Sequence, residues 1–490
     1  MLIIYVSLGV YFLAMLFVFA YALAQADLLW HFFKFSKEKP TPLSAESDSL
    51  PFVTIQLPVF NEMYVVERLL ESLAKMHYPL DKLEVQILDD STDSTQEIIK
   101  SKLKEFPGFP FVYMHREDRK GFKAGALREA LAEAKGEFIA IFDADFVPDP
   151  EFLYKTLGHF ADPKVGLVQT RWTHLNEGFS VLTRLQAFAL DAHFTVEQMG
   201  RNAQNAFINF NGTGGIWRKS CILDAGNWHD DTLTEDLDLS YRAQERGWRF
   251  IYRPDIESPA ELPPVMPAIK SQQFRWTKGG AECAVKHLGE VLRKPYSLRK
   301  KLHAMAHLLN SAIFVAILTA AISSIPIWYG FYKGMLDVQY FRAAPVFLLG
   351  FVIIAMVYFF ANSSLSKHSP KRWLRFAWEL PLFLSASMGL ALHNSQAVWE
   401  AWTGKKSPFV RTPKYNLVAG NHALLKSAYH RFQVPVGTYL ELSFGIVFLS
   451  IAIFSALSHT YPFLVFHLLL GFGFLLVGIQ SLVGLRSIPR

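Results

Sequence analysis

Long apolar segments at the N-terminus and after residue 303 constrain the fold of this chain more than any other feature. Residues 2–30 contain a single charged residue, Asp27, and are long enough to span a bilayer. Signal peptides have a basic start and a shorter apolar core, so we expect a transmembrane helix here. Lys34, Lys37 and Lys39 follow it, and the positive-inside rule therefore predicts an outside N-terminus and a cytoplasmic chain from residue 34 onward.

The chain after residue 303 is predicted to form a membrane bundle. Four segments have the length and composition of crossings: 304–329, 343–360, 440–457 and 461–482. Segment 376–398 contains Pro381 and lies between two basic stretches that both favour the cytoplasmic side. We therefore expect five crossings plus a re-entrant or interfacial element at 376–398, with six crossings as the alternative.

The composition supports a membrane protein with a separate polar unit. Hydrophobic residues make up 51% of the 490 residues and charged residues 19%, which is too apolar for an ordinary soluble protein. The length suggests two or three structural units. Cys221 and Cys283 lack metal-ligand spacing and cannot form a disulfide framework, so we expect buried free thiols.

Carboxylates follow strand-like apolar runs in the polar middle of the chain. Residues 85–88 precede Asp89 and Asp90, and residues 138–142 precede Asp143 and Asp145. The carboxyl ends of parallel strands open into one crevice, so these clusters should meet there. Two such carboxylates can grip a divalent cation, Mg²⁺ or Mn²⁺, that carries a diphosphate. With a separate carboxylate as base, this arrangement is typical of transferases that use nucleotide sugars.

Other patterns extend this α/β interpretation. Residues 53–57 and 165–171 are predicted strands, and residues 61–76, 126–134 and 178–200 are predicted helices. Ser91 or Thr92 is expected to cap the helix after Asp90. The basic, glycine-punctuated stretch 119–125 places Lys123 at a helix start, where backbone NH groups can bind a diphosphate.

Five motifs then carry a family resemblance. They are Asp90, Asp143-Ala144-Asp145, Phe210-Asn211-Gly212-Thr213, Thr234-Glu235-Asp236 and Gln272-x-x-Arg275-Trp276. In this order they resemble the processive inverting family 2 glycosyltransferases, and most of all the cellulose-synthase-like group that makes mannan, glucomannan or related β-glycans. The resemblance covers roughly residues 50–415. It implies a GT-A domain, with a mixed, mostly parallel sheet, inserted between transmembrane helices and followed by a C-terminal helical membrane bundle.

The resemblance also implies roles for these residues. Asp236 would be the general base, flanked by Thr234 and Glu235, and would depend on its position more than on a large pKa shift. Asp143 and Asp145 would hold the metal. The implied donor site comprises Asp90, Lys123, Asp143, Arg275, Thr412 and Lys414. The implied acceptor site comprises Asn211, Gly212, Thr213, Gln272 and Trp276.

A loop near residue 410 resembles the gating loop of cellulose synthases, whose pattern is Phe-x-Val-Thr-x-Lys. Phe409, Thr412 and Lys414 match this pattern, whereas Arg411 replaces the valine. A basic loop that closes over a diphosphate and excludes water suits the chemistry.

These observations predict an order of domains. Residues 1–32 form a transmembrane helix, 33–50 a linker, and 51–262 a cytoplasmic GT-A domain. Residues 263–303 are basic and partly apolar and predict amphipathic interface helices. We exclude a nucleic-acid patch there, because apolar spans flank it and no nucleic-acid fold signature accompanies it. Residues 304–490 form the bundle, with the interfacial segment 376–398 and a gating-like loop at 405–415.

The expected function is transfer of hexose from a GDP- or UDP-sugar to a growing glycan that is threaded through the bilayer. Polar residues in or near the spans would mark its path: Asn310, Asn362, His393, Asn394 and Gln396. The alternative is a lipid glycosyltransferase, and an inactive receptor is disfavoured because every expected carboxylate is present. The inner or plasma membrane or the Golgi would host the protein, with the catalytic domain cytoplasmic. A homo-oligomer stays open.

Overall fold

The computed structural model describes residues 1–35, 50–337, 339, 344–365, 372–417 and 434–486. Its polar part is built on a seven-stranded sheet in the order β3-β2-β1-β4-β6-β5-β7. The strands are β1 (Val53–Val59), β2 (Leu83–Asp89), β3 (Phe111–His115), β4 (Phe138–Ile141), β5 (Val165–His174), β6 (Gly215–Arg218) and β7 (Arg249–Ala260). Only β6 runs antiparallel to its neighbours β4 and β5. The expected mixed, mostly parallel sheet is therefore confirmed.

Helices cover both faces of this sheet. They are α2 (Val66–Leu73), α3 (Thr95–Leu103), α4 (Phe122–Glu133), α5 (Phe152–Leu157), α6 (Val181–Ala192), α7 (Gln198–Ala203), α8 (Lys219–Asp224) and α9 (Glu235–Glu245). Because side chains alternate across a strand, two apolar cores form. Ile55 and Leu57 pack with α2 on one face, and Ile139 and Ile141 pack with α4 on the other.

Three strands were not predicted, and each has a local cause. β3 is an edge strand without a buried side chain, and β6 has four residues. β7 contains Pro254 and Pro259, and its pairing with β5 shifts register between Thr170 and Arg171. β6 and β7 lack the long apolar run by which a central strand is recognised in sequence. β3 has a short apolar run, but it follows Pro110 and lies at the edge of the sheet.

The predicted cap at Ser91 or Thr92 is wrong. α3 begins at Thr95, whose backbone NH donates to Asp93 Oδ1 over 2.9 Å. Ser91 Oγ instead accepts a hydrogen bond from the backbone NH of Asn61, 2.8 Å away. The hydroxyl therefore ties the end of β1 to the end of β2, a long-range contact that local sequence does not reveal.

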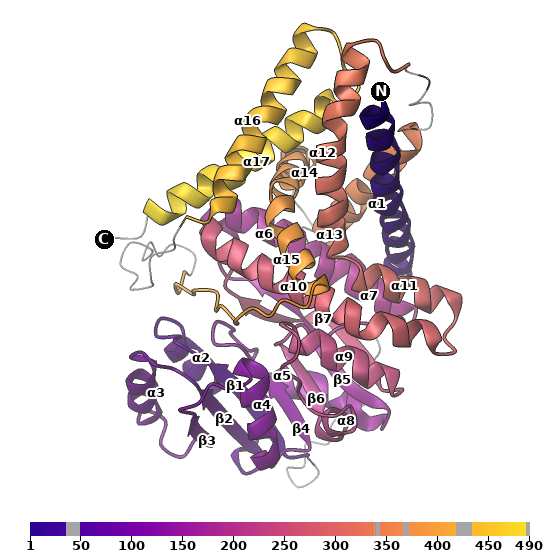
Figure 1. Ribbon diagram of the computed structural model, residues 1–490. Coiled ribbons are helices and arrows are strands. Elements are labelled where there is room, and N and C mark those ends of the chain that lie inside the picture. Colours follow the sequence, from indigo (N-terminus) through magenta and orange to yellow (C-terminus); the bar gives the residue numbers. More distant parts are fainter. Residues whose placement is uncertain (36–49, 338, 340–343, 366–371, 418–433, 487–490) are drawn as a thin grey trace.

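The described residues include five helices that are long and apolar enough to cross a membrane: α1 (Leu2–Lys34), α12 (Ala312–Tyr332), α13 (Ala344–Leu365), α16 (Val436–Leu457) and α17 (Leu464–Arg486). They overlap the five expected crossings, but α12 begins at Ala312 and not at residue 304, because residues up to Leu308 belong to a separate helix. They lie on the other side of α10 (Met266–Arg293) and α11 (Leu298–Leu308) from the sheet (Figure 1). The chain is thus an integral membrane protein, and its described residues also form a polar domain.

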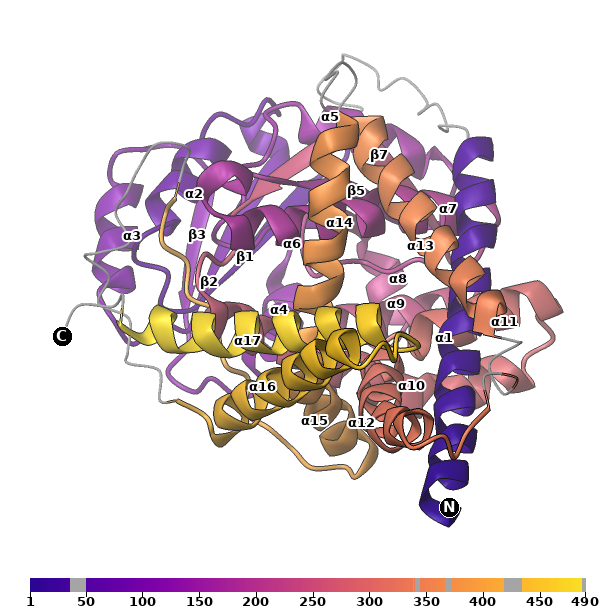
Figure 2. The ribbon, with the colours of Figure 1, turned by 90° about the horizontal axis from the view of Figure 1, so that it is seen from above.

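The segment expected to be interfacial forms α14 (Arg372–Gly389) and α15 (Ala391–Trp402), with Pro381 inside α14. Figure 2 shows α14 lengthwise where α12 is seen end-on, and Figure 1 shows the reverse, so α14 runs crosswise to α12. Glycines allow α14 to cross α17 closely: a Cβ at Gly389 would lie 2.2 Å from the Gly473 carbonyl oxygen. Neither α14 nor α15 is among the five apolar helices.

A buried ion pair joins the polar and membrane parts. Lys270 Nζ of α10 lies 2.8 and 2.9 Å from the two carboxylate oxygens of Glu441 on α16, and both residues are at most 5% exposed. Removing one partner of such a pair strands a buried charge, which costs about 3–5 kcal/mol.

We therefore predict that Lys270→Met lowers the midpoint of thermal unfolding in detergent markedly, since it leaves Glu441 charged and alone. The double variant Lys270→Met/Glu441→Met should recover most of the loss, because no charge remains buried. An unchanged midpoint for the single variant, or additive losses in the double, would contradict this role.

Candidate active site

A cavity of about 170 Å³ opens where β1, β2 and β4 end. It collects all but one of the residues predicted for the site, from segments far apart in the chain. These are Asp90, Lys123, Asp143, Asp145, Asn211, Gly212, Thr234, Glu235, Asp236, Gln272, Arg275, Trp276, Thr412 and Lys414. Asp90, Asp143 and Asp145 thus share the expected crevice. Asp89 does not: it is fully buried and accepts hydrogen bonds from the Ser91 backbone NH and the Tyr113 hydroxyl.

Thr213 is the exception. It is fully buried, and its hydroxyl accepts a hydrogen bond from the backbone NH of Asp143 over 2.9 Å. Its side chain therefore supports the Asp143 loop from behind rather than lining the cavity as an acceptor contact.

Asp143 and Asp145 follow β4 directly, and each faces a lysine. Lys123 Nζ lies 2.5 Å from Asp143 Oδ1, and Lys414 Nζ lies 2.7 Å from Asp145 Oδ2. The Asp143 side chain is 35% exposed and that of Asp145 is 4% exposed, so one carboxylate reaches into the open cavity and the other lies at its floor. Two carboxylates on one cavity are an all-oxygen donor set, which fits a hard divalent cation such as Mg²⁺ or Mn²⁺.

Glu261, which the sequence did not single out, lies beside this pair. Its backbone NH donates to Asp145 Oδ2 over 3.1 Å, and burial raises the pKa of its own carboxyl group. Glu261 comes at the end of β7, the strand that the sequence patterns missed, so no signal pointed to it.

Asp90 is held by an arginine. Arg116 donates from Nε to Asp90 Oδ1 over 2.8 Å and from Nη2 to Oδ2 over 2.7 Å. Asp90 thus pairs with a side chain and does not cap α3, which begins at Thr95. A two-pronged arginine contact fixes the plane of the carboxylate, and Arg116 is a further residue that sequence reasoning missed.

Asp236 lies in the first turn of α9, at the wall of the cavity. Its Oδ1 accepts from the backbone NH of Leu237 over 2.8 Å. Burial, together with the neighbouring Glu235 carboxylate, raises the pKa of Asp236 to about 7. The sequence predicts that position matters more than a pKa shift for a base at this place, and here the pKa is shifted as well.

Gly212 makes room for this carboxylate. Its φ is +79°, and a Cβ there would lie 3.1 Å from Asp236 Oδ2. Glycine is thus required by conformation as well as by space.

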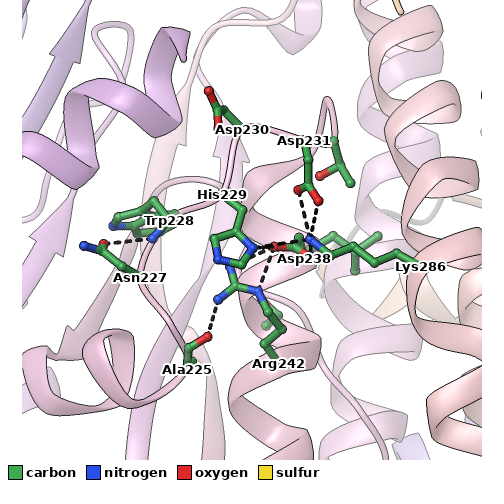
Figure 3. A network of polar contacts seen from close by, with 12 residues as sticks. Ala225, Asn227, Trp228, His229, Asp230, Asp231, Asp238, Arg242 and Lys286 are labelled. Atoms are coloured by element: carbon green, nitrogen blue, oxygen red, sulfur yellow. Dashed lines mark hydrogen bonds and ion pairs between the residues drawn. The ribbon is translucent and has the colours of Figure 1, made fainter. Parts of the chain in front are cut away.

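The rest of the acidic run at 230–238 serves a different purpose. His229, Asp231 and Asp238 have ligand atoms within 4.8 Å of one another, a spacing that suits a metal ion. However, Lys286 Nζ lies 2.9 and 2.8 Å from the two Asp231 oxygens and 2.7 Å from Asp238 Oδ1, and Arg242 also contacts Asp238 (Figure 3). Cations of the protein already neutralise this cluster, so we interpret it as a structural network that anchors α9 to α10.

The Gln-x-x-Arg-Trp motif lies on α10. Gln272, Arg275 and Trp276 all line the cavity. The Arg275 guanidinium lies 4.5 Å from the centre of the Phe409 ring, and its Nη2 lies 3.5 Å from Thr412 Oγ1. Burial lowers the pKa of Arg275, whereas Glu235, Asp143 and Asp236 oppose this effect.

The gating-like loop lies across the cavity and is fastened at several points. Arg411 forms a two-pronged ion pair with Glu62, with its Nε 2.8 Å from Glu62 Oε1. Arg411 thus replaces the family's valine with a charged contact to the end of β1. The backbone NH of Tyr415 donates to Glu261 Oε1 over 2.9 Å.

Lys278 fixes the base of the loop. It is fully buried on α10, and its Nζ donates to the Lys405 carbonyl oxygen over 2.6 Å and to Ser407 Oγ over 2.5 Å. The helix that carries the Gln-x-x-Arg-Trp motif therefore also sets where the loop begins.

The comparisons with known proteins agree with this geometry. The family model described as "Glycosyltransferase like family 2" matches residues 51–279. Residues 51–279 are a family 2-like glycosyltransferase domain.

The chain is also similar to curated plant proteins. It is 39% identical over 308 residues to glucomannan 4-beta-mannosyltransferase 7 of Arabidopsis thaliana, over 58% of this chain and 55% of that protein. It is 40% identical over 296 residues to glucomannan 4-beta-mannosyltransferase 1 of Oryza sativa subsp. japonica, over 56% of each chain. It thus matches just over half of the length of these relatives.

A solved structure shares the fold. Mannosyltransferase PcManGT from Pyrobaculum calidifontis, in complex with GDP-Man and Mn²⁺, has a TM-score of 0.53 and 22% sequence identity. The match covers 79% of this chain and 100% of that chain.

The fastening of the loop leads to a prediction that does not depend on activity. Glu62→Gln removes the charged partner of Arg411, and hydrogen bonds to charged groups contribute about 1.5–3 kcal/mol each. We expect trypsin to cleave after Lys406 or Arg411 at least about tenfold faster, since cleavage follows the population of the open loop. Mass spectrometry of timed digests measures this, with Glu67→Gln on α2 as the matched control. Equal cleavage rates in wild type and Glu62→Gln would show that the pair does not hold the loop.

Proposed function

We propose that this protein is a membrane-embedded inverting β-glycosyltransferase. It would transfer hexose from a nucleotide diphosphate sugar to a growing polysaccharide of the glucan, mannan or glucomannan type. One observation carries the proposal: a single cavity gathers the Asp143–Asp145 pair, Asp236 and Trp276 under a basic loop. The names of the plant relatives, and the GDP-Man bound to the solved neighbour PcManGT, support mannosyl transfer from a GDP-sugar.

The proposed chemistry assigns a task to each side of the cavity. Asp236 accepts the proton of the acceptor hydroxyl, whose oxygen attacks the anomeric carbon of the donor. The bond from that carbon to the diphosphate breaks on the opposite face, so the configuration inverts and a nucleoside diphosphate leaves. Lys123, Lys414 and Arg275 line the same cavity and provide positive charge for the diphosphate.

Asp143 and Asp145 would hold the divalent cation, Mg²⁺ or Mn²⁺. When bound, such an ion neutralises charge that develops on the leaving diphosphate. In the structure, one lysine balances each carboxylate. Because two ammonium groups carry the same total charge as one divalent cation, the cation can take their place without a change in local charge.

The proposed acceptor side is the α10 side. Trp276 would stack against the acceptor sugar, and the polymer would leave through the membrane helices that continue from α10. The basic loops favour a cytoplasmic catalytic domain, in the inner or plasma membrane or the Golgi. The rival is a lipid glycosyltransferase with the same donor site but a membrane-embedded acceptor.

The metal proposal predicts that Asp145→Ala loses turnover and that excess EDTA has the same effect on the wild type. Release of nucleoside diphosphate from the purified protein measures both. Asp81→Ala, at an exposed position remote from the cavity, is the control and should behave as wild type. Full activity in EDTA would contradict the proposal.

The base proposal predicts a pH dependence. Because burial raises the pKa of Asp236 to about 7 and only the ionised carboxylate accepts a proton, kcat/KM should fall as the pH drops below about 7. Asp236→Asn should lower the rate by about 10²–10⁴-fold and abolish this acidic limb, with donor affinity nearly unchanged. A variant that keeps the limb, or that loses donor affinity at an unchanged maximal rate, would show that another group is the base.

Product size separates the polymerase from its rival. Burial of an aromatic contact such as that proposed for Trp276 contributes roughly a kcal/mol or more, so Trp276→Ala should shorten chains while slow hydrolysis of the donor persists. Chromatographic sizing with a β-glycanase digest measures this. An organic-extractable glycolipid as the sole wild-type product would overturn the polymerase.

A further inference from the structure

A π-helical turn, η5 (His193–Glu197), interrupts the path from α6 to α7. Such turns are rare and occur frequently at functional sites. Its first and last residues contact each other: His193 Nδ1 lies 3.0 Å from Glu197 Oε2. The other ring nitrogen, Nε2, lies 3.2 Å from Oδ1 of Asn211, which lines the active-site cavity.

Glu197 connects this histidine to the first membrane helix. Gln25 of α1 is 3% exposed and donates from Nε2 to Glu197 Oε1 over 2.8 Å. Arg201 Nη2 lies 3.1 Å from Glu197 Oε2. Burial opposes the charge on Glu197, but Arg201, His193 and Gln25 outweigh it and lower its pKa, so the carboxylate stays ionised.

The backbone around this contact is closely packed. A Cβ at Gly200 of α7 would lie 2.4 Å from the Leu28 carbonyl oxygen of α1, and α1 packs against both α7 and η5. The position of the π-helical turn is therefore tied to the membrane helix by packing as well as by hydrogen bonds.

Contacts to its oxygen atom orient the side-chain amide of Asn211. Oδ1 accepts from Asn209 Nδ2 over 2.8 Å and faces His193, whereas Nδ2 has no hydrogen-bond partner among the described residues. A buried amide donor without a partner is costly. A hydroxyl of a bound sugar would satisfy it.

We propose that His193 and Glu197 are positioning residues that hold the Asn211 amide toward the sugar acceptor, with Gln25 of α1 supporting them. This rests on the proposed function, because it assumes that a sugar acceptor binds on the Asn211 side of the cavity. Asp143 and Asp145 are paired with lysines and not with His193 or Glu197. His193 and Glu197 therefore act on acceptor transfer and not on donor chemistry.

The test compares two reactions of the same purified protein in detergent. One is hydrolysis of the donor without acceptor, and the other is transfer to β-1,4-linked mannohexaose. His193→Ala should raise the KM for mannohexaose about tenfold or more, which corresponds to one lost hydrogen bond to a fixed group, with hydrolysis and donor KM within about twofold of wild type. Glu197→Gln and Gln25→Leu should lower transfer relative to hydrolysis in the same way but to a smaller extent. These two variants carry the test if His193→Ala fails to fold.

Two controls exclude a merely structural effect. Thr195→Val lies in the same turn but loses only a bond to the Asp191 carbonyl oxygen, so its ratio of transfer to hydrolysis should match wild type. His193→Gln keeps an amide that can donate to Asn211 and should recover part of the loss.

A double-mutant cycle tests whether His193 acts through Asn211. The variant His193→Ala/Asn211→Ala should be no worse in transfer than Asn211→Ala alone. Additive losses, or equal losses in transfer and hydrolysis, would overturn the inference. The polymerase proposal can fail without the inference failing, namely if the wild type uses only a lipid acceptor. In that case the ratio of transfer to hydrolysis is measured with that lipid as the acceptor.

Discussion

A cluster of carboxylates can be kept together in a partly enclosed cavity only if cations neutralise it, and the rest of this structure depends on that constraint. Asp143 faces Lys123, Asp145 faces Lys414, and Glu62 faces Arg411. The partners come from separate segments of the chain, so the cavity forms only when the sheet, α4 and the loop after α15 are all in place.

The same constraint links the catalytic domain to the membrane helices. Two lysines of α10 make these links: Lys278 contacts the base of the loop, and Lys270 contacts Glu441 of α16. α10 thus presents Trp276 to the cavity while it is fastened to both the loop and the bundle. A movement of the membrane helices would therefore also move the cavity residues of α10. The hydrogen bond between Gln25 and Glu197 connects α1 to the polar domain as well.

The sequence was sufficient for features that follow from local pattern. Apolar run length located the five membrane helices, and apolar runs followed by aspartates located β2 and β4 and the site at their ends. It was insufficient wherever a residue acts through a distant partner. Nothing near Asp90 pointed to Arg116, and nothing near Arg411 pointed to Glu62. Thr213 belongs to a motif of the site, yet its side chain is fully buried and does not line the cavity.

The central claim is that one cavity transfers hexose from a nucleotide diphosphate sugar to a β-linked polymer. The most direct test incubates the purified, detergent-solubilised protein with GDP-mannose, GDP-glucose and UDP-glucose in turn, each with Mg²⁺ or Mn²⁺. Release of nucleoside diphosphate and the length of the product are measured together. The account predicts release from a GDP-sugar with a polymer that β-mannanase or β-glucanase digests. Release from none of the donors, with the metal present and the protein folded, would contradict it.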